Sequence, residues 1–374
     1  MAERALDVQK DIFACFVDYE KAFDKLRHEK LFGILKDLEV DGRDLRLIKN
    51  LYWRQKAGVR VGEEISMWQD IRRGVRQGCV LSPDLFNIYS EVIMRDLVEL
   101  EGIRVGGGNV NNIRYADDTV LLADSAEKLE SLVGALVRAS DRYGLKLNTT
   151  KTKIMVVTKG SDMVRVNVRV GEEVLEQVEK YKYLGSLVTQ DGRCVEDIKT
   201  RIAIAKNAFT KIKAMVTNRA ISINLRKRFI KAYVWSTLTY GCEAWTINKE
   251  MERRIEAMEM WCYRRMLKIA WTERVSNEQV LIRAGAKREM MRMIRQRQLR
   301  FLGHVMRRQQ LESNCMTGRL DGRRGRGRPR MKFLDSLAKA VGRGTRPVEL
   351  LQMTSRREDW RSMVANVLGD TAPR

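Results

Sequence analysis

The chain has 374 residues, of which 44% are hydrophobic and 32% charged, and its formal net charge is +23. This length allows two or three domains with a sizeable core, and the apolar content excludes global disorder. No apolar stretch approaches the roughly 20 residues of a membrane helix, and the first residues form no signal-peptide pattern. The sequence therefore predicts no membrane partner.

The positive charge is concentrated in the second half of the chain. Residues 1–200 carry 32 Lys and Arg against 33 Asp and Glu, whereas residues 201–374 carry 39 against 15. The electrostatic field of this positive half predicts a partner with a phosphate backbone. An acidic membrane surface is a weaker alternative, because the basic half contains no lipidation motif. The 6 cysteines form no close CxxC pair and only 2 histidines are present, so a local zinc site is not expected. Reduced thiols are typical of the cytoplasm or the nucleus.

In chain order, the first predicted element is a strand over 11–19, an apolar run that ends at Asp18. Helices are expected over 25–40, 43–54 and 84–100, with a short hairpin around Gly62 before the last of them. Strands at 103–105 and 110–115 precede a helix that Ser125 caps and that runs to Tyr143. Strands at 153–157, 164–170 and 182–188 complete the expected mixed sheet.

Two adjacent carboxylates, Asp117 and Asp118, lie at the expected bend between two apolar strands. Like charges held together repel, and a divalent cation removes that repulsion. Mg²⁺ prefers carboxylate oxygens, water and phosphates, and two such ions about 3.5–4 Å apart can clamp both oxygens of a phosphoryl displacement. Asp18, at the end of the first strand, is the candidate third carboxylate; its alternative is an ordinary acid in a turn. The pattern points to nucleotidyl transfer.

Five segments, in order, resemble the catalytic motifs of reverse transcriptases from non-LTR (LINE-type) retroelements. They are residues 16–24, 73–83, 115–118, 144–152 and 183–185. The resemblance implies an RNA-directed DNA polymerase that uses an RNA template, a DNA primer and deoxynucleoside triphosphates. It also implies that Asp18, Asp117 and Asp118 hold two Mg²⁺ ions, with Mn²⁺ as a possible substitute.

The resemblance also implies an α+β fold, in which a right-hand polymerase palm is a mixed sheet backed by helices. A basic, mainly helical thumb and C-terminal region is expected to follow it. The expected domains are 1–190 (palm with partial fingers), 191–310 (thumb-like region) and 311–374 (an Arg/Gly-rich linker with short helices). Within 191–310, helices are predicted at 196–217, 223–240, 249–270, 276–284 and 287–304.

Four further residues are candidate nucleotide contacts by resemblance. Phe23 matches a bulky ring beneath the sugar that would clash with a ribose 2′-hydroxyl, and its alternative is a core Phe. Gln77 and Gly78 match the nucleotide pocket, and their alternative is a glycine-punctuated turn before the next helix. Lys151 matches a cation near the leaving phosphate, and a solvated surface lysine is the competing interpretation.

An Arg/Gly-rich segment at 322–330 has no apolar side chain and is expected to be a flexible loop. Its candidate nucleic-acid contacts are Arg323, Arg324, Arg326, Arg328 and Arg330. Residues 326–329 resemble the core of an AT-hook, which inserts arginines into an A·T minor groove. General phosphate binding and nuclear import are the alternatives.

The chain starts close to Asp18, so the sequence predicts an N-terminally truncated polymerase that lacks the endonuclease and most of the fingers. Two functions stay open at this point: an active polymerase module, and a catalytically inactive remnant that binds nucleic acid. A third possible function, that of an RNA-templated RNA polymerase, is disfavoured by Phe23. The sequence leaves the oligomeric state open.

Overall fold

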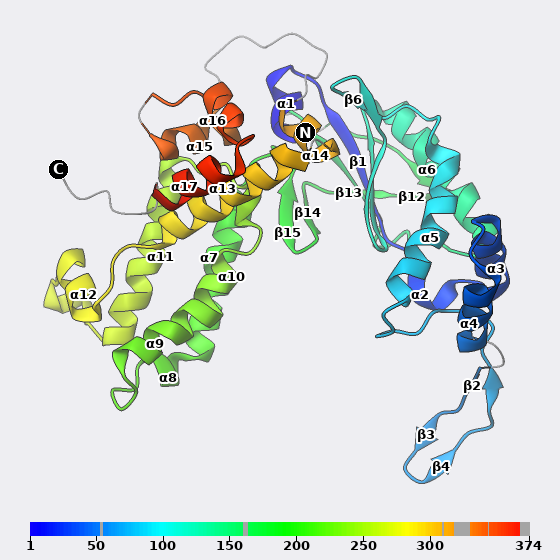
Figure 1. Ribbon diagram of the computed structural model, residues 1–374, viewed down its shortest axis with the longest axis horizontal. Helices are drawn as coiled ribbons and strands as arrows, with labels where there is room; N and C mark the ends of the chain where they lie inside the picture. The colour runs from blue at the N-terminus through cyan, green and yellow to red at the C-terminus, as the bar shows by residue number, and fades with distance from the viewer. Residues whose placement is uncertain (53–54, 160–163, 309, 318–329, 343, 367–374) are drawn as a thin grey trace.

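The computed structural model describes the chain except for residues 53–54, 160–163, 309, 318–329, 343 and 367–374. A sheet backed by helices forms one side of the molecule, and a helical region forms the other (Figure 1). Among the described residues, no helix is both long and apolar enough to cross a membrane.

The central sheet has five strands in the order β13-β10-β1-β9-β8. Their bounds are β1 Ile12–Val17, β8 Asn112–Tyr115, β9 Asp118–Ala123, β10 Lys153–Val157 and β13 Glu176–Gln177. The middle strand, β1, pairs antiparallel with β9 and β10, whereas β13 joins β10 in parallel. A strand with both edges paired and both faces covered needs a continuous apolar run, and every residue of β1 is buried.

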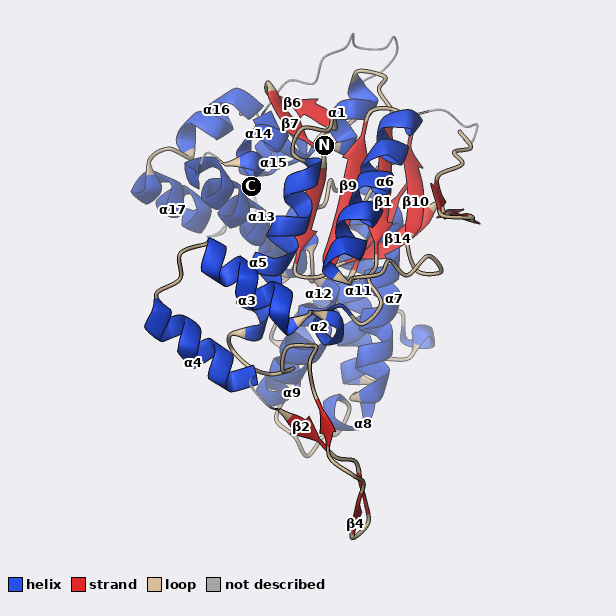
Figure 2. Cartoon of the chain, turned by 90° about the vertical axis from the view of Figure 1, so that its right-hand side faces the viewer, coloured by secondary structure: helices blue, strands red, loops and turns tan. Residues whose placement is uncertain are grey.

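One face of the sheet is covered by two helices, α5 (Ser82–Met94) and α6 (Ala126–Tyr143), which cross it on the viewer's side in Figure 2. The odd-numbered residues of β1, Phe13, Cys15 and Val17, pack into this core. Ser125 caps α6 as predicted, because its side chain accepts the N–H of Lys128.

The opposite face is covered by α1 (Ala2–Asp7) and by the hairpin of β6 (Ile103–Val105) and β7 (Gly108–Val110). The even-numbered residues of β1, Ile12, Ala14 and Phe16, pack there. The period-2 alternation of a strand therefore divides one apolar run between two cores.

The segment between β1 and α5 extends away from the sheet (Figure 2). It contains α2 (Ala22–Lys25), α3 (His28–Asp37) and α4 (Gly42–Tyr52). Two small ladders follow, β2 (Lys56–Ala57) with β5 (Gln69–Asp70) and β3 (Arg60–Val61) with β4 (Glu64–Ile65). The predicted hairpin around Gly62 is confirmed, and Gly62 has φ +64° in its turn.

The prediction that 164–170 and 182–188 join the sheet is wrong. These segments instead form separate hairpins, β11–β12 (Arg169–Val170, Glu173–Val174) and β14–β15 (Lys180–Tyr183, Ser186–Thr189). The physical reason is visible at β14, whose Tyr181 ring stacks on Phe16 with centroids 4.2 Å apart. This hairpin therefore packs over the face of the sheet and does not extend its edge.

From Val195 to Arg308 the described residues form helices, as the sequence predicts. They are α7 (Val195–Lys211), α8 (Lys213–Val216), α9 (Ile223–Phe229), a π-helical turn (Ile230–Trp235), α10 (Ser236–Leu238), α11 (Lys249–Leu267), α12 (Asn277–Ala284) and α13 (Met290–Arg308). Their core includes Phe209, Trp235 and Tyr263. A buried carboxylate joins this region to β15, because Asp197 accepts the backbone N–H of Leu187 and the indole N–H of Trp245.

The last described helices are α14 (Leu311–Thr317), α15 (Phe333–Val341), α16 (Pro347–Met353) and α17 (Arg357–Asn366). Those from α15 onward form a small core with the second half of α13, around Leu302, Leu337 and Trp360. The architecture confirms the predicted α+β class, with a mixed sheet backed by helices and followed by a mainly helical region. The three domain boundaries stay a prediction.

Candidate active site

The end of β1 carries the first candidate carboxylate. Asp18 follows Val17 directly, and its even number places it on the same face of the sheet as Phe16. Its backbone is held by the turn before β10: the Asp18 carbonyl accepts the N–H of Asn148 at 2.8 Å, and the Asp18 N–H donates to Thr152 Oγ1 at 3.2 Å. Thr152 is fully buried, so this anchor is shielded from water.

The other two candidate carboxylates belong to the tight hairpin of β8 and β9. Tyr115 pairs with Asp118 across a two-residue turn made of Ala116 and Asp117. Val17 pairs with Thr119 in the neighbouring ladder, so one further step of that register sets Asp18 opposite Asp118. Side chains opposite each other on antiparallel strands have Cβ atoms about 4.5–5.5 Å apart.

The three carboxylates influence one another. The pKa of Asp118 is raised, first by desolvation and then by the charges of Asp117 and Asp18. One Asp18 oxygen, Oδ2, is buried and makes no hydrogen bond within the described part of the chain. Lys151 Nζ lies 3.8 Å from it, beyond hydrogen-bond range.

The donor chemistry suits a hard divalent cation, since three carboxylates with an orphaned buried oxygen are what such an ion neutralises. Their convergence is incomplete, however. Across the described residues, no group of three or more His, Cys, Asp or Glu side chains is arranged to hold a metal ion.

Lys151 is brought to the carboxylates by the same turn that anchors Asp18. Its N–H donates to the Asn148 carbonyl at 3.2 Å, and its side chain is 68% exposed while the Nζ atom lies near Asp18. The position is compatible with an electrostatic role, and an exposed ion pair of this length adds little stability by itself.

Two tyrosines of β14 lie beside the carboxylates: Tyr183 begins the predicted motif 183–185, whereas Tyr181 was not among the predicted site residues. The Tyr183 hydroxyl donates to the backbone oxygen of Asp118 at 3.4 Å. Burial, and then the charge of Asp118, raise the pKa of Tyr183 to about 12, and the pKa of Tyr181 is raised by burial and by Asp18 and Asp118. The alternation of Lys and Tyr over 180–183 is the signal that could have identified this pair of tyrosines.

Phe23 and the segment 74–78 form a second part of the region. Phe23 is half-buried on α2 and stacks on Phe86 of α5, with centroids 4.7 Å apart. Gly74 has φ +90°, and a Cβ there would lie 3.1 Å from the backbone of Asp24. This glycine therefore allows the backbones at Gly74 and Asp24 to approach each other closely. Gln77 and Gly78 are exposed, and a Cβ at Gly78 would meet nothing within 4 Å.

The described residues include one of the five Arg/Gly-rich candidates. The described residues do not include the other four, Arg323, Arg324, Arg326 and Arg328. Arg330 is described, and its guanidinium donates to the backbone oxygen of Asp191 at 3.3 Å.

Comparison with known proteins identifies the family. Residues 2–188 match the family described as reverse transcriptase (RNA-dependent DNA polymerase). The chain belongs to the reverse transcriptase family. The predicted reverse transcriptase is thereby confirmed, and matches to the R2 polyprotein and to the jockey polymerase confirm the predicted resemblance to non-LTR elements. The five-stranded sheet with its acidic hairpin is the palm of this reverse transcriptase.

Proteins that are similar to this chain include two transposon-related relatives and one solved structure. A transposon-derived protein of Caenorhabditis elegans is 29% identical over 251 residues, which cover 64% of this chain and 88% of that protein. The Pol polyprotein of the retrotransposable element R2 of Nasonia vitripennis is 27% identical over 52% of this chain, but the match spans only 20% of the polyprotein. A telomerase of Candida tropicalis, solved with a fragment of telomeric RNA, matches with a TM-score of 0.39 and 12% identity, covering 82% of this chain and 48% of its own.

Proposed function

We propose that this reverse transcriptase chain is the polymerase module of a LINE-type retroelement and joins deoxynucleotides to a DNA primer on an RNA template. The observation that carries the proposal is the strand register, which sets Asp18 at the end of β1 opposite Asp118, with Asp117 in the adjoining hairpin turn. The proposal includes Mg²⁺, or Mn²⁺ in its place, and a location in the nucleus or the cytoplasm.

In this proposal the three carboxylates are the ligands of two divalent ions. When bound, the ions would activate the primer 3′-hydroxyl as a nucleophile and stabilise the negative charge on the leaving pyrophosphate. Lys151 adds a positive charge beside Asp18, close to where the leaving phosphates would lie. Thr152 and Tyr183 fix the backbones of Asp18 and Asp118, so they act as positioning residues.

Phe23, Gln77 and Gly78 form the proposed nucleotide pocket. The Phe23 ring is fixed from behind by Phe86, which supports a role as a rigid steric barrier to a ribose 2′-hydroxyl. Gln77 is exposed and can both donate and accept a hydrogen bond, and Gly78 leaves open space for a ligand.

A second candidate function is nucleic-acid binding without catalysis. It is supported by the positive charge of residues 201–374. Under this alternative the chain binds RNA or DNA in a salt-sensitive, metal-independent manner.

Primer extension separates the two functions. We would measure incorporation of dTTP on poly(rA)/oligo(dT) with Mg²⁺ or Mn²⁺ at low salt, comparing Asp117→Asn with Asp141→Asn. Asp141 is an exposed acid at the end of α6, so its replacement removes the same charge away from the site. We expect metal-dependent extension that falls by about 1,000-fold in Asp117→Asn, because a lost ligand removes several kcal/mol of charge stabilisation.

An unchanged rate in Asp117→Asn would contradict the polymerase mechanism. Absence of extension in the unmodified chain, with retained binding of the template–primer, would favour the inactive remnant.

A further inference from the structure

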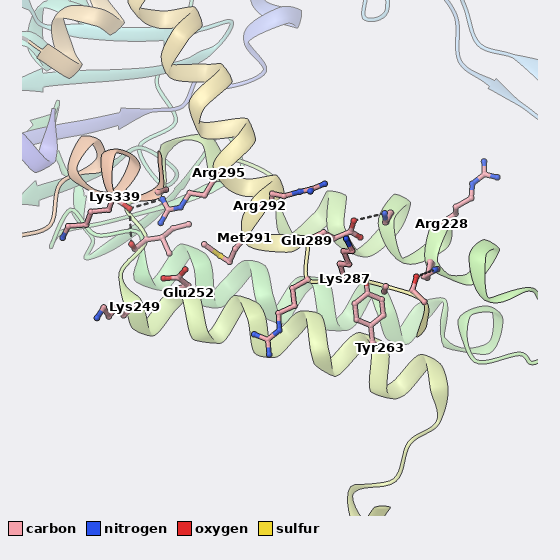
Figure 3. Close-up of a pocket in the computed structure, with 18 of the residues that line it drawn as sticks. Arg228, Lys249, Glu252, Tyr263, Lys287, Glu289, Met291, Arg292, Arg295 and Lys339 are labelled. Atoms are coloured by element: carbon pink, nitrogen blue, oxygen red, sulfur yellow. Dashed lines mark hydrogen bonds and ion pairs between the residues drawn. The ribbon is translucent and has the colours of Figure 1, made fainter. Parts of the chain in front are cut away.

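The helical half of the chain contains a large cavity that lies apart from the palm carboxylates. This cavity, called the basic groove below, has a volume of about 1080 Å³ and is bordered by α9, α11, the N-terminal part of α13, and α15. Among the described residues, nine Lys and Arg side chains line it against two Glu side chains, and none of these lining residues precedes Asn224. Figure 3 shows these side chains extending from several elements around one space.

Some of the cations make contacts between the segments that border the groove. Lys231 pairs with Glu289 at 3.0 Å, Lys227 donates to the Gly285 carbonyl at 2.7 Å, and Arg295 donates to Ser336 of α15 at 3.0 Å. Burial lowers the pKa of Arg295, which fits its place as a tether between α13 and α15.

Three other cations of the groove are accessible to a ligand. Arg228, Lys249 and Lys339 come from three different helices, and all three are exposed. With Glu289 paired to Lys231, Glu252 is the remaining acid among the described lining residues. A concave surface of one charge sign focuses the electrostatic field and attracts an extended anion.

A second cavity adjoins the basic groove, because Arg288 lines both. This cavity, called the Trp271 cavity, has a volume of about 1010 Å³ and also borders α11. The Trp271 side chain is 93% exposed, although it belongs to a turn fixed by a hydrogen bond from the Ala270 N–H to Glu273. The guanidinium of Arg265 covers the neighbouring Trp261 ring at 4.7 Å.

An exposed indole among cations matches the chemistry of single-stranded nucleic acid. Unpaired bases stack on aromatic rings while cationic grooves follow the backbone. A base inside a duplex already stacks on both of its neighbours and is not free to stack on Trp271. Each cavity already reaches the upper end of the 300–1,000 Å³ range of small-molecule pockets, and together they suit a longer chain.

We propose that the basic groove and the Trp271 cavity form one binding track for single-stranded nucleic acid, with phosphates in the groove and an unpaired base on Trp271. The track adds a binding site for the partner of the proposed function. It rests on that function only for the choice of nucleic acid as the partner. Its contacts do not involve Asp18, Asp117 or Asp118, so binding there does not require catalysis.

Fluorescence anisotropy with the full chain tests the track. The probe is a fluorescein-labelled oligo(rU) of about 20 nucleotides, titrated between 50 and 300 mM salt. The groove variant is Arg228→Gln/Lys249→Gln/Lys339→Gln. The matched control is Arg356→Gln/Arg357→Gln/Arg361→Gln, which removes the same charge from the exposed surface near and on α17, away from both cavities.

We expect the groove variant to bind about 10- to 100-fold more weakly, and its salt slope to fall by about 2, since each lost phosphate contact removes roughly 0.7 for single strands. The control should change affinity by less than about 3-fold. Trp271→Ala should weaken oligo(rU) binding by about 10-fold and leave the affinity for a blunt RNA duplex unchanged.

Equal losses in the groove variant and the control would overturn the track, because net charge alone would then explain binding. Unchanged oligo(rU) affinity in Trp271→Ala, or no binding by the unmodified chain, would overturn it as well. Thermal unfolding of each variant checks that it is folded. Primer extension with the same variants separates the two proposals, since a chain without polymerase activity still gives a decisive binding result.

Discussion

Ala116 has φ +53°, a left-handed backbone conformation that costs a residue with a Cβ about 1–2 kcal/mol. The strain persists because the pairs Tyr115–Asp118 and Arg114–Thr119 determine the hairpin on both sides of the turn. A tight turn with paired flanks leaves Asp117 little freedom to move. Such strain is often kept where a side chain must be held in one direction.

Phe23 gives a prediction at the same scale. In Phe23→Ala, the ratio of ribonucleotide to deoxynucleotide incorporation should rise by about 10- to 100-fold, because the proposed barrier to the 2′-hydroxyl is removed. The measurement is competitive primer extension with rUTP and dTTP, reported as a ratio so that lower stability does not affect it.

Phe32→Ala is the matched control for Phe23→Ala. Phe32 is also half-buried and packs against the same palm core. A similar change of the ratio in both variants would show that Phe23 is an ordinary core residue.

The sequence predicted the site residues that carry charge, but not the contacts by which other residues support them. Asp18, Asp117 and Asp118 stand at the ends of apolar runs, where a pattern can reveal them. Thr152 and Tyr181 act through contacts between segments more than 130 residues apart, as the hydrogen bond between Asp18 and Thr152 shows. Only the fold brings such residues together, so no local pattern announces them.

At the scale of elements, α13 joins two cores. Its first half contributes Ile294 to the core of the thumb-like helices, and its second half contributes Leu302 to the core of the last helices. Its N-terminus is capped by a carboxylate from another helix. Glu259 of α11 is 1% exposed and accepts the N–H groups of Glu289 and Met290 at 2.9 and 3.2 Å.

Burial raises the pKa of Glu259 to about 7, against an ordinary value of 4.5. The folded state therefore holds this proton more tightly than the unfolded state. Its contribution to the free energy of unfolding is complete below about pH 4.5 and is lost as the pH rises to 7, by roughly 3 kcal/mol. Glu259→Gln keeps an oxygen acceptor without the charge, so this decline should flatten.

Urea unfolding between pH 5 and 8 measures the effect of Glu259→Gln. Glu250→Gln, at an exposed position on the same helix, should keep the decline. The same slope in both variants would contradict a buried titration at Glu259.

Long elements with a clear apolar period were predictable, as α6 and β1 show. The elements that the sequence did not reveal are short or depend on tertiary contacts. The two-residue β13 and the six-residue α1 are too brief to show a period. β14 has a strand-like pattern, but its partner strand and its packing on Phe16 were decided by the fold.

At the scale of the whole molecule, α1 connects the palm to the last helices. The Glu3 carboxylate accepts the Phe333 N–H at 3.1 Å and the hydroxyl of Thr246, and Asp7 pairs with Lys332. The apolar side of α1 packs on the sheet through Ala5 and Leu6. One short helix thus contacts the palm, the thumb-like region and the C-terminal helices.

Glu3→Ala/Asp7→Ala should loosen the last helices without unfolding the palm. Amide exchange in α15 should accelerate by about 10-fold, whereas exchange in α6 stays unchanged, because regional opening follows local contacts. Hydrogen–deuterium exchange with mass spectrometry measures both. A control with Glu29→Ala/Asp44→Ala, two exposed acids of α3 and α4, should alter neither helix; equal exchange of α15 in both double variants would contradict the connection.

The contacts of α1 also set an order of events during protein synthesis. Arg4 donates to the carbonyl of Met316, and Glu3 accepts from Phe333, across 312 and 330 residues. At roughly 5–20 residues per second, the ribosome needs on the order of 15 to 70 seconds to deliver those partners. The palm therefore emerges long before these partners of α1 exist, and the packing of α1 against α15 is a late step of folding.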